Sequence, residues 1–241
     1  METLAFILDN LASIATMTVQ HLEIVGVGVG CAILTGVPLG IAITVNERLA
    51  KIVLYVASTI MTIPSVALFG LMIPMLSVIG QGIGFLPTVI ALFLYSQLPI
   101  VRNTYTAITN IDPALREAAR GMGMKTGERL RRVEIPIALP IIMAGVRMAV
   151  VINVGVAAIA AYIGAGGLGK LISRGISQSD PRQLIAGAIL VSVLAIAADF
   201  GLGYVQRLLT PKGLRSPSRA AGLALRLGAL AGFRKHPRHA Q

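Results

Sequence analysis

The chain has 241 residues, of which 55% are hydrophobic and 13% charged, and its mean hydropathy is +0.80. Because a soluble domain carries about 25% charged residues, this composition excludes an ordinary soluble enzyme and indicates an integral membrane protein. The length allows five or six spans of about 20 residues and is too short for a fused ATPase as well. The net charge of +11 would suggest nucleic acid binding in a soluble protein. Here basic loops and a basic tail explain it better, and no nucleic-acid partner is expected.

The first 18 residues are expected to form an interfacial helix. Apolar residues recur at helical spacing from Leu4 to Ile14, and Asp9 and Asn10 lie opposite them. This pattern is typical of a helix that lies on the membrane surface. A helix packed against other helices has the same pattern, so both alternatives stay open.

Five apolar stretches then predict an all-α, polytopic membrane protein with about five transmembrane helices. Their expected bounds are 19–45, 52–75, 85–100, 137–162 and 184–204. In the first stretch, Gly26 with Gly30 and Gly36 with Gly40 form two small-xxx-small steps, which let another helix approach closely. Pro64 lies inside the second stretch, where it removes a backbone hydrogen bond that neighbouring helices must replace.

A polar, mostly basic segment that begins at Asp112 separates the third and fourth stretches. Asp112 followed by Pro113 is a helix-start signal, because the carboxylate can accept from free N–H groups and the fixed φ of proline suits the first turn. Gly121 and Gly123 then stop the helix. Thr126 is placed to cap a second one. The segment therefore predicts two short helices joined by a glycine turn.

The same segment resembles the EAA loop of ABC-transporter permeases, whose pattern is E-A-A-x3-G-x9-I-x-L-P. The matching residues are Glu117, Ala118, Ala119, Gly123, Val133, Ile135 and Pro136. Val133 stands for the family's isoleucine and Ile135 for its leucine, and both changes conserve shape and polarity. The tripeptide alone is common, but the complete spacing between two apolar stretches is much more specific.

In that family the loop is a coupling helix that docks into a groove on a cytoplasmic ATPase. The resemblance therefore implies a cytoplasmic coupling loop, about residues 103–135, between the third and fourth spans. Ala118 and Ala119 would supply the small side chains that such a groove needs, and Glu117 a charge at its edge. The expected ATPase-coupling residues are Glu117, Ala118, Ala119, Gly121, Gly123 and Pro136.

Other stretches are similar to the osmoprotectant branch of these permeases, which serves glycine betaine, choline or carnitine. They are His21-Leu22, 36–40 (GVPLG), 63–68 (IPSVAL), 98–105 (LPIVRNTY), 163–169 (IGAGGLG) and 209–214 (LTPKGL). The permease domain is accordingly expected over residues 19–214. Methionine-type permeases share the coupling loop and a similar glycine turn, and are the nearest alternative. The stretch from Arg102 to Tyr105 favours the osmoprotectant branch.

The resemblance also implies the partners. Two permease chains, identical or paralogous, would form the path, ABC ATPase subunits would bind ATP, and an extracytoplasmic substrate-binding protein would deliver the solute. No catalytic residue, metal or cofactor is expected in this chain, and no substrate-binding residue is indicated. Quaternary ammonium groups are commonly held in aromatic cages. Because the chain has no Trp, such a cage is expected in the binding protein.

A secondary transporter or a channel is the alternative from another class. A secondary transporter would be expected to show repeated halves or paired intramembrane charges. Neither is evident in the sequence, and a channel would not need the coupling loop.

Two features of the sequence could indicate a specific binding or transport site. Gly164, Gly169 and Lys170 are spaced as in a phosphate-binding P-loop, but Leu171 stands where that motif needs a hydroxyl. A glycine-rich turn at a membrane face is therefore expected. Asp199 is a carboxylate inside a span, which indicates function by default. Since it lies near the end of its span, two helical turns before Arg207, a structural ion pair or an interfacial position is expected instead.

The distribution of Lys and Arg predicts the orientation. With five spans, Arg48, Lys51, the coupling loop and the tail fall on one side, which the positive-inside rule places in the cytoplasm of a bacterial cell. The N-terminus is then outside the inner membrane. The basic tail, residues 215–241, is expected to be flexible and dispensable, and to associate with anionic membrane lipid at about 1 kcal/mol for each basic residue.

This orientation predicts the result of reporter fusions. A reporter fused after Gln241 should be active only in the cytoplasm, and one fused at Met1 only outside, because an odd number of spans places the ends on opposite sides. Both ends on the same side would rule out five spans.

Overall fold

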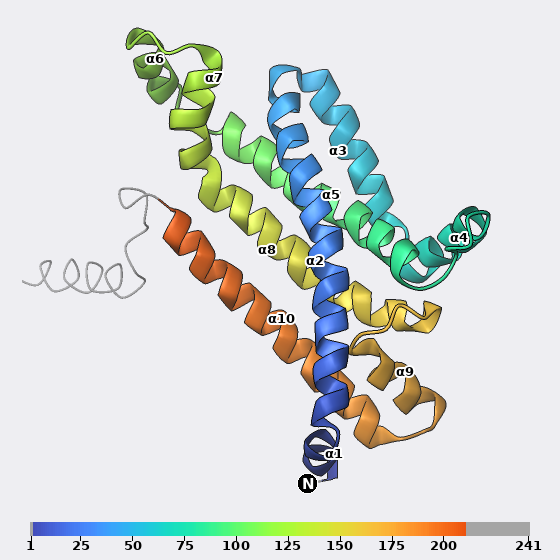
Figure 1. The fold of residues 1–241 in the computed structure, drawn as a ribbon. Coiled ribbons are helices and arrows are strands. Elements are labelled where there is room, and N and C mark those ends of the chain that lie inside the picture. The colour runs from blue at the N-terminus through green and yellow to red at the C-terminus, as the bar shows by residue number, and fades with distance from the viewer. Residues whose placement is uncertain (1, 211–241) are drawn as a thin grey trace, which may run out of the picture.

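The computed structural model describes residues 2–210, and over this range the protein contains helices and no strand (Figure 1). The helices are α1 (Glu2–Asp9), α2 (Leu11–Ala42), α3 (Glu47–Thr62), α4 (Ser65–Ser77), α5 (Phe85–Thr109), α6 (Pro113–Gly121), α7 (Thr126–Arg129), α8 (Ile135–Ile159), α9 (Gly169–Ser177) and α10 (Pro181–Leu209). The shorter turns are the 3-10 helices η1 (Ile43–Val45) and η3 (Ala160–Ile163) and the π-helix η2 (Leu130–Glu134). The prediction of an all-α fold is confirmed. The basic tail lies outside the described residues.

Four helical runs of the described chain are long and apolar enough to cross a membrane. They are Leu11–Val45, Phe85–Thr109, Thr126–Ile163 and Pro181–Leu209. The pair α3 and α4 passes the same test only when taken together, and its two helices are bent by 97° at the break between them. Counted as one span, this pair makes five, so the prediction of about five spans is confirmed.

The second expected span, residues 52–75, is broken into two helices. The chain breaks at Ile63, which is extended (φ −69°, ψ 125°) before Pro64. Proline disfavours the helical conformation of the residue that precedes it, and the hydroxyl of Tyr95 donates a hydrogen bond to the Ile63 carbonyl. Because that carbonyl has a partner on α5, the break is tolerated. Helix α4 then runs in a new direction (Figure 1), and its Leu68 and Phe69 pack against α5.

Small residues bring α2 against α5. The contact face of α2 consists of Gly28, Ala32, Gly36 and Gly40. A Cβ atom on Gly40 would lie 2.6 Å from the Cβ of Thr104, so only glycine fits this approach. The second small-xxx-small step is therefore confirmed as a helix contact. A Cβ added to Gly26 or Gly30, the first step, would meet no atom of another helix within 4 Å in the described part of the chain.

Helix α8 packs on α5 and on α2, and polar groups are buried in these contacts. Asn153 is fully buried and donates to the Ser96 hydroxyl at 2.7 Å and to the Ala149 carbonyl at 2.9 Å. The buried ring of His21 lies with its Nε2 3.1 Å from the carbonyl oxygen of Val154. Because buried polar groups are costly without partners, these bonds fix which faces of α2, α5 and α8 meet.

The N-terminal segment is packed rather than isolated. Phe6 and Ile7 of α1 pack against an apolar cluster that includes Ile14 and Leu171, whereas Leu4 is 64% exposed. Of the two alternatives that the sequence left open, packing against other helices is thus observed, and an interfacial position stays a prediction. Helix α2 begins at Leu11, eight residues before the expected start of the first span.

A polar cluster joins α8 to α10 between their apolar surfaces. The guanidinium of Arg147 donates to both carboxylate oxygens of Asp199, at 2.9 and 2.8 Å. It also donates to Gln206 at 3.0 Å, and the amide of Gln206 donates to the Pro140 carbonyl at 2.9 Å. The expected ion pair of Asp199 is confirmed, but its partner is Arg147 on the neighbouring helix, not the nearby Arg207.

We expect each charge of this pair to depend on the other. Asp199→Leu leaves the Arg147 guanidinium without its counter-ion in a membrane-spanning helix, which should lower the stability by about 2 kcal/mol. Arg147→Leu should have a similar effect, and the double variant should recover most of the loss. Thermal unfolding in detergent measures all three. A double variant less stable than either single variant would contradict this account of the pair.

Candidate functional site

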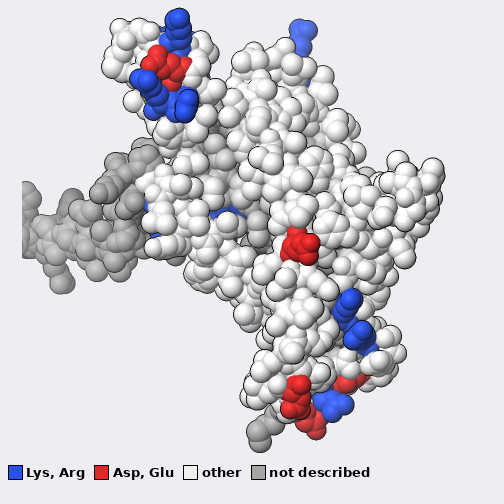
Figure 2. Space-filling model, in the orientation of Figure 1, with Lys and Arg blue, Asp and Glu red and all other residues white. Residues whose placement is uncertain are grey.

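The segment that carries the EAA pattern, residues 112–136 (the EAA segment), lies at one end of the molecule. Helices α6 and α7 are at the top of Figure 1, and α1 and α9 are at the opposite end. Charged side chains gather at these two ends, and the surface between them is largely uncharged (Figure 2). The apolar band is what a bilayer requires, and it places the EAA segment outside the membrane core.

The local structure of the EAA segment follows from its sequence signals. The Asp112 carboxylate accepts a hydrogen bond from the N–H of Ala114 at 2.9 Å, and Pro113 is the first residue of α6. Gly123 has φ +79°, the left-handed conformation that glycine adopts without strain. The first short helix and the glycine turn that ends it are thus confirmed.

The cap predicted for the second helix was wrong. Lys125 occupies the N-cap position of α7, and Thr126 is already the first helical residue, with no side-chain cap bond in the helix. Helix α7 is also not separate from the span that follows. It continues through η2 into α8 and η3, so residues 126–163 form one helical run.

The six expected coupling residues do not share one surface. Glu117, Ala118, Gly121 and Gly123 are exposed. In contrast, Ala119 is only 1% exposed and faces this chain's own atoms, and Pro136 is half-buried in the first turn of α8. A large side chain at position 119 would therefore disturb the segment itself, so a test of docking belongs at Ala118.

Helix α6 presents an exposed apolar face centred on Ala118. Leu115 is 44% exposed and Met122 is 69% exposed. They lie three residues before and four residues after Ala118, which is the spacing of residues on one side of a helix. These two residues were not among those expected from the EAA pattern, although their helical spacing to Ala118 is visible in the sequence.

A buried carboxylate lies beneath this face. Glu134, which is 4% exposed, accepts a hydrogen bond from Arg129 Nε at 2.7 Å, and Arg116 Nε lies 3.4 Å from the same oxygen. Arg116 also donates through Nη2 to the carbonyl of Ile108, near the end of α5. The sequence did not indicate this cluster, because its members are separated by spacings that a regular helix would not bring together.

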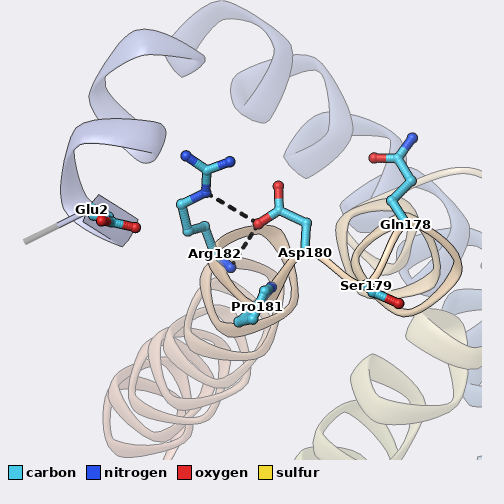
Figure 3. A pocket seen from close by; sticks show the side chains of 6 residues that line it. All are labelled: Glu2, Gln178, Ser179, Asp180, Pro181 and Arg182. Carbon is cyan, nitrogen blue, oxygen red and sulfur yellow. Dashed lines mark hydrogen bonds and ion pairs between the residues drawn. The ribbon is translucent and has the colours of Figure 1, made fainter.

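A second polar surface lies at the opposite end, around a hollow of about 450 Å³. Its lining comes from α1, from the turn between α9 and α10 and from the start of α10: Glu2, Gln178, Ser179, Asp180, Pro181 and Arg182 (Figure 3). Asp180 accepts from the backbone N–H of Arg182 at 3.0 Å and from its Nε at 3.2 Å. These hydrogen bonds hold the pKa of the Asp180 carboxyl below its usual value. Asp180 thus has its partners within the chain and serves as the cap of α10.

The glycine-rich turn, residues 163–169, is packed instead of open. The N–H of Gly167 donates to Gln20 Oε1 at 3.3 Å, and a Cβ on Gly169 would lie 2.0 Å from the carbonyl oxygen of Ala158. The glycines therefore serve close contacts with α2 and α8 and do not form a cradle for phosphate. In residues 2–210, no three His, Cys, Asp or Glu side chains are grouped as a metal ion would need.

The described chain is thus a bundle of apolar spans with a polar helical segment at one end. The family model of the binding-protein-dependent transport system inner membrane component matches residues 33–211. The chain therefore belongs to this family of ABC-transporter permeases and is a multi-pass protein of the bacterial inner membrane.

Individual relatives agree with this assignment. The chain is 58% identical over 215 residues to the osmoprotectant import permease protein OsmW of Salmonella typhimurium, covering 89% of this chain and all of the relative. It is 40% identical to the glycine betaine/carnitine/choline transport system permease protein OpuCB of Bacillus subtilis, over 89% of this chain and 96% of the relative. An inward-facing structure of the MetNI methionine ABC transporter is similar at 25% identity with a TM-score of 0.72, covering 80% and 94% of the two chains.

Proposed function

We propose that this chain is the permease subunit of an ATP-driven importer of a small osmoprotectant such as glycine betaine, choline or carnitine. The support for the cargo is the 58% identity to an osmoprotectant import permease and the 40% identity to a glycine betaine/carnitine/choline permease. A methionine-type importer is the second candidate, since a methionine transporter has a similar fold. Its lower identity of 25% favours the osmoprotectant.

The observation that carries the transport mechanism is the exposed apolar face of α6. Leu115, Ala118 and Met122 form a narrow stripe with a small residue at its centre, and charged residues such as Glu117 and Arg120 flank it. A small central residue lets a helix enter a groove on another protein, and the apolar residues on either side provide buried area. We infer that an ABC ATPase subunit receives α6 in such a groove.

The remaining partners follow from this assignment. The EAA segment lies in the cytoplasm, and the end formed by α1 and α9 faces the extracytoplasmic binding protein. A second copy or a paralogue completes the path, and membrane lipid surrounds the apolar surface. ATP is bound and hydrolysed on the ATPase subunits, whose closure tilts the spans between outward-facing and inward-facing states. This chain supplies the path and the docking helix and needs no cofactor of its own.

Ala118→Trp tests the docking face. The indole ring would stand on the contact side of α6, so association with the ATPase should weaken by about tenfold or more, which corresponds to about 1.4 kcal/mol. ATP-driven uptake should fall with it, while membrane insertion stays normal. Co-purification of the ATPase and uptake by the assembled complex measure the two effects.

Ala5→Trp is the matched control, because Ala5 is exposed at the opposite end of the molecule. It should leave ATPase association unchanged. If Ala118→Trp also associates and transports normally, α6 does not dock an ATPase and the proposed coupling role is wrong.

A further inference from the structure

Glu134 is a buried carboxylate that the docking face of α6 does not use. It is the last residue of the π-helical turn η2, directly before α8, and only 4% of its surface is exposed. One of its oxygens, Oε1, meets Arg129 Nε at 2.7 Å and Arg116 Nε at 3.4 Å. A single acidic group thus lies between two cations that come from different helices, α7 and α6.

The π-helical turn allows Glu134 to pair with Arg129. Residues advance by about 100° each in a regular α-helix, so Arg129 and Glu134, five positions apart, would lie roughly 140° apart around the axis. A π-helix closes its hydrogen bonds over five residues and brings these positions to the same side. Helical distortions of this kind are frequent at functional sites. Here the distortion allows the ion pair between Arg129 and Glu134.

The second pair extends the cluster to a third helix. Arg116 contacts Glu134 through Nε and donates through Nη2 to the Ile108 carbonyl in the last turn of α5. A cation is favourable at a helix C-terminus, where carbonyl groups lack partners. The cluster therefore connects α6 to the end of α5 and to the base of the helical run that contains α8.

The chain connects α6 to its neighbouring helices through two short joints. Residues 110–112 connect α5 to α6, and residues 122–125 connect α6 to α7. Within the second link, Gly123 adopts a positive φ. A Cβ added to Gly121 or Gly123 would meet no atom within 4 Å. Packing around Gly121 and Gly123 is therefore open, whereas Ile111 in the other joint is buried in an apolar cluster with Ile108 and Ile142. The side-chain cluster around Glu134 is the polar contact that, together with the buried Ala119, resists rotation of α6.

We propose that Glu134 is a positioning residue that fixes α6 to α5 and α8, so that a displacement imposed on α6 moves the spans instead of being absorbed by the joints. This inference rests on the proposed docking of an ATPase on α6. Loss of the carboxylate charge leaves two largely buried guanidinium groups without their counter-ion. The cluster then loosens while the exposed docking face keeps its residues.

The test compares Glu134→Gln with Glu128→Gln in the complete complex with its ATPase and binding protein. Glu128 lies in the same segment and pairs with Arg132 at 2.9 Å, but the two side chains of this pair are 39% and 69% exposed. The two variants therefore remove the same charge from a buried cluster and from a solvated pair. Uptake in reconstituted vesicles is measured together with ATP hydrolysis.

Glu134→Gln should still assemble with the ATPase and hydrolyse ATP, but its uptake per ATP hydrolysed should fall by about fivefold or more, the range of typical coupling between sites. Glu128→Gln should match the parent. A parental ratio of uptake to hydrolysis in Glu134→Gln would overturn the proposal. So would a loss of assembly, hydrolysis and uptake in parallel, because that result describes a stability role only.

Glu134→Asp provides a second variant that keeps the charge in the buried site. Its shorter side chain weakens the contact with Arg129 and should give an intermediate ratio of uptake to hydrolysis, and a parental ratio would again count against the proposal. Failure of the docking assignment is distinguishable from failure of this inference, because it appears as normal ATPase association in Ala118→Trp.

Discussion

The close approach of α2 and α5 is the constraint on which the described structure depends. Glycines at Gly28, Gly36 and Gly40 let the two backbones meet, and the Cβ that Gly40 lacks would fall 2.6 Å from that of Thr104. Gly145 then brings α8 against α5, where an added Cβ would lie 2.6 Å from the Pro99 carbonyl oxygen. The position of α5 in turn fixes the Ile108 carbonyl, to which Arg116 of the EAA segment is bonded. The glycine contacts inside the bundle therefore determine where α6 is held.

Features that depend on neighbours within one helical turn could be predicted from the sequence. The Asp112 cap and the Gly123 turn are of this kind. The effect of a proline could not be predicted in the same way. Pro38, Pro74, Pro99 and Pro140 all lie inside continuous helices, whereas the helix breaks before Pro64. The difference lies in a tertiary contact, because the Ile63 carbonyl freed by the break is bonded by Tyr95, 32 residues away.

The partners of the charged residues could not be predicted from local sequence either. An ion pair of Asp199 was expected, yet its partner Arg147 is 52 residues away on another helix. Glu134 and Arg129 are close in the chain but meet only because η2 is a π-helix. The EAA pattern likewise identified the segment but not the sides of α6, since Ala118 is exposed and the adjacent Ala119 is buried. Spacing identified the function class, and the fold was needed to separate the exposed residues of α6 from the buried ones.

The central claim is that this permease moves an osmoprotectant at the expense of ATP. The most direct measurement is uptake of labelled glycine betaine, choline and carnitine into vesicles that contain the permease with its ATPase. The binding protein is added outside and ATP is enclosed inside. At least one of these solutes should be taken up, and this uptake should require both enclosed ATP and the binding protein and persist when ion gradients are collapsed. Uptake that needs no ATP and follows an ion gradient would contradict this claim and identify a secondary transporter.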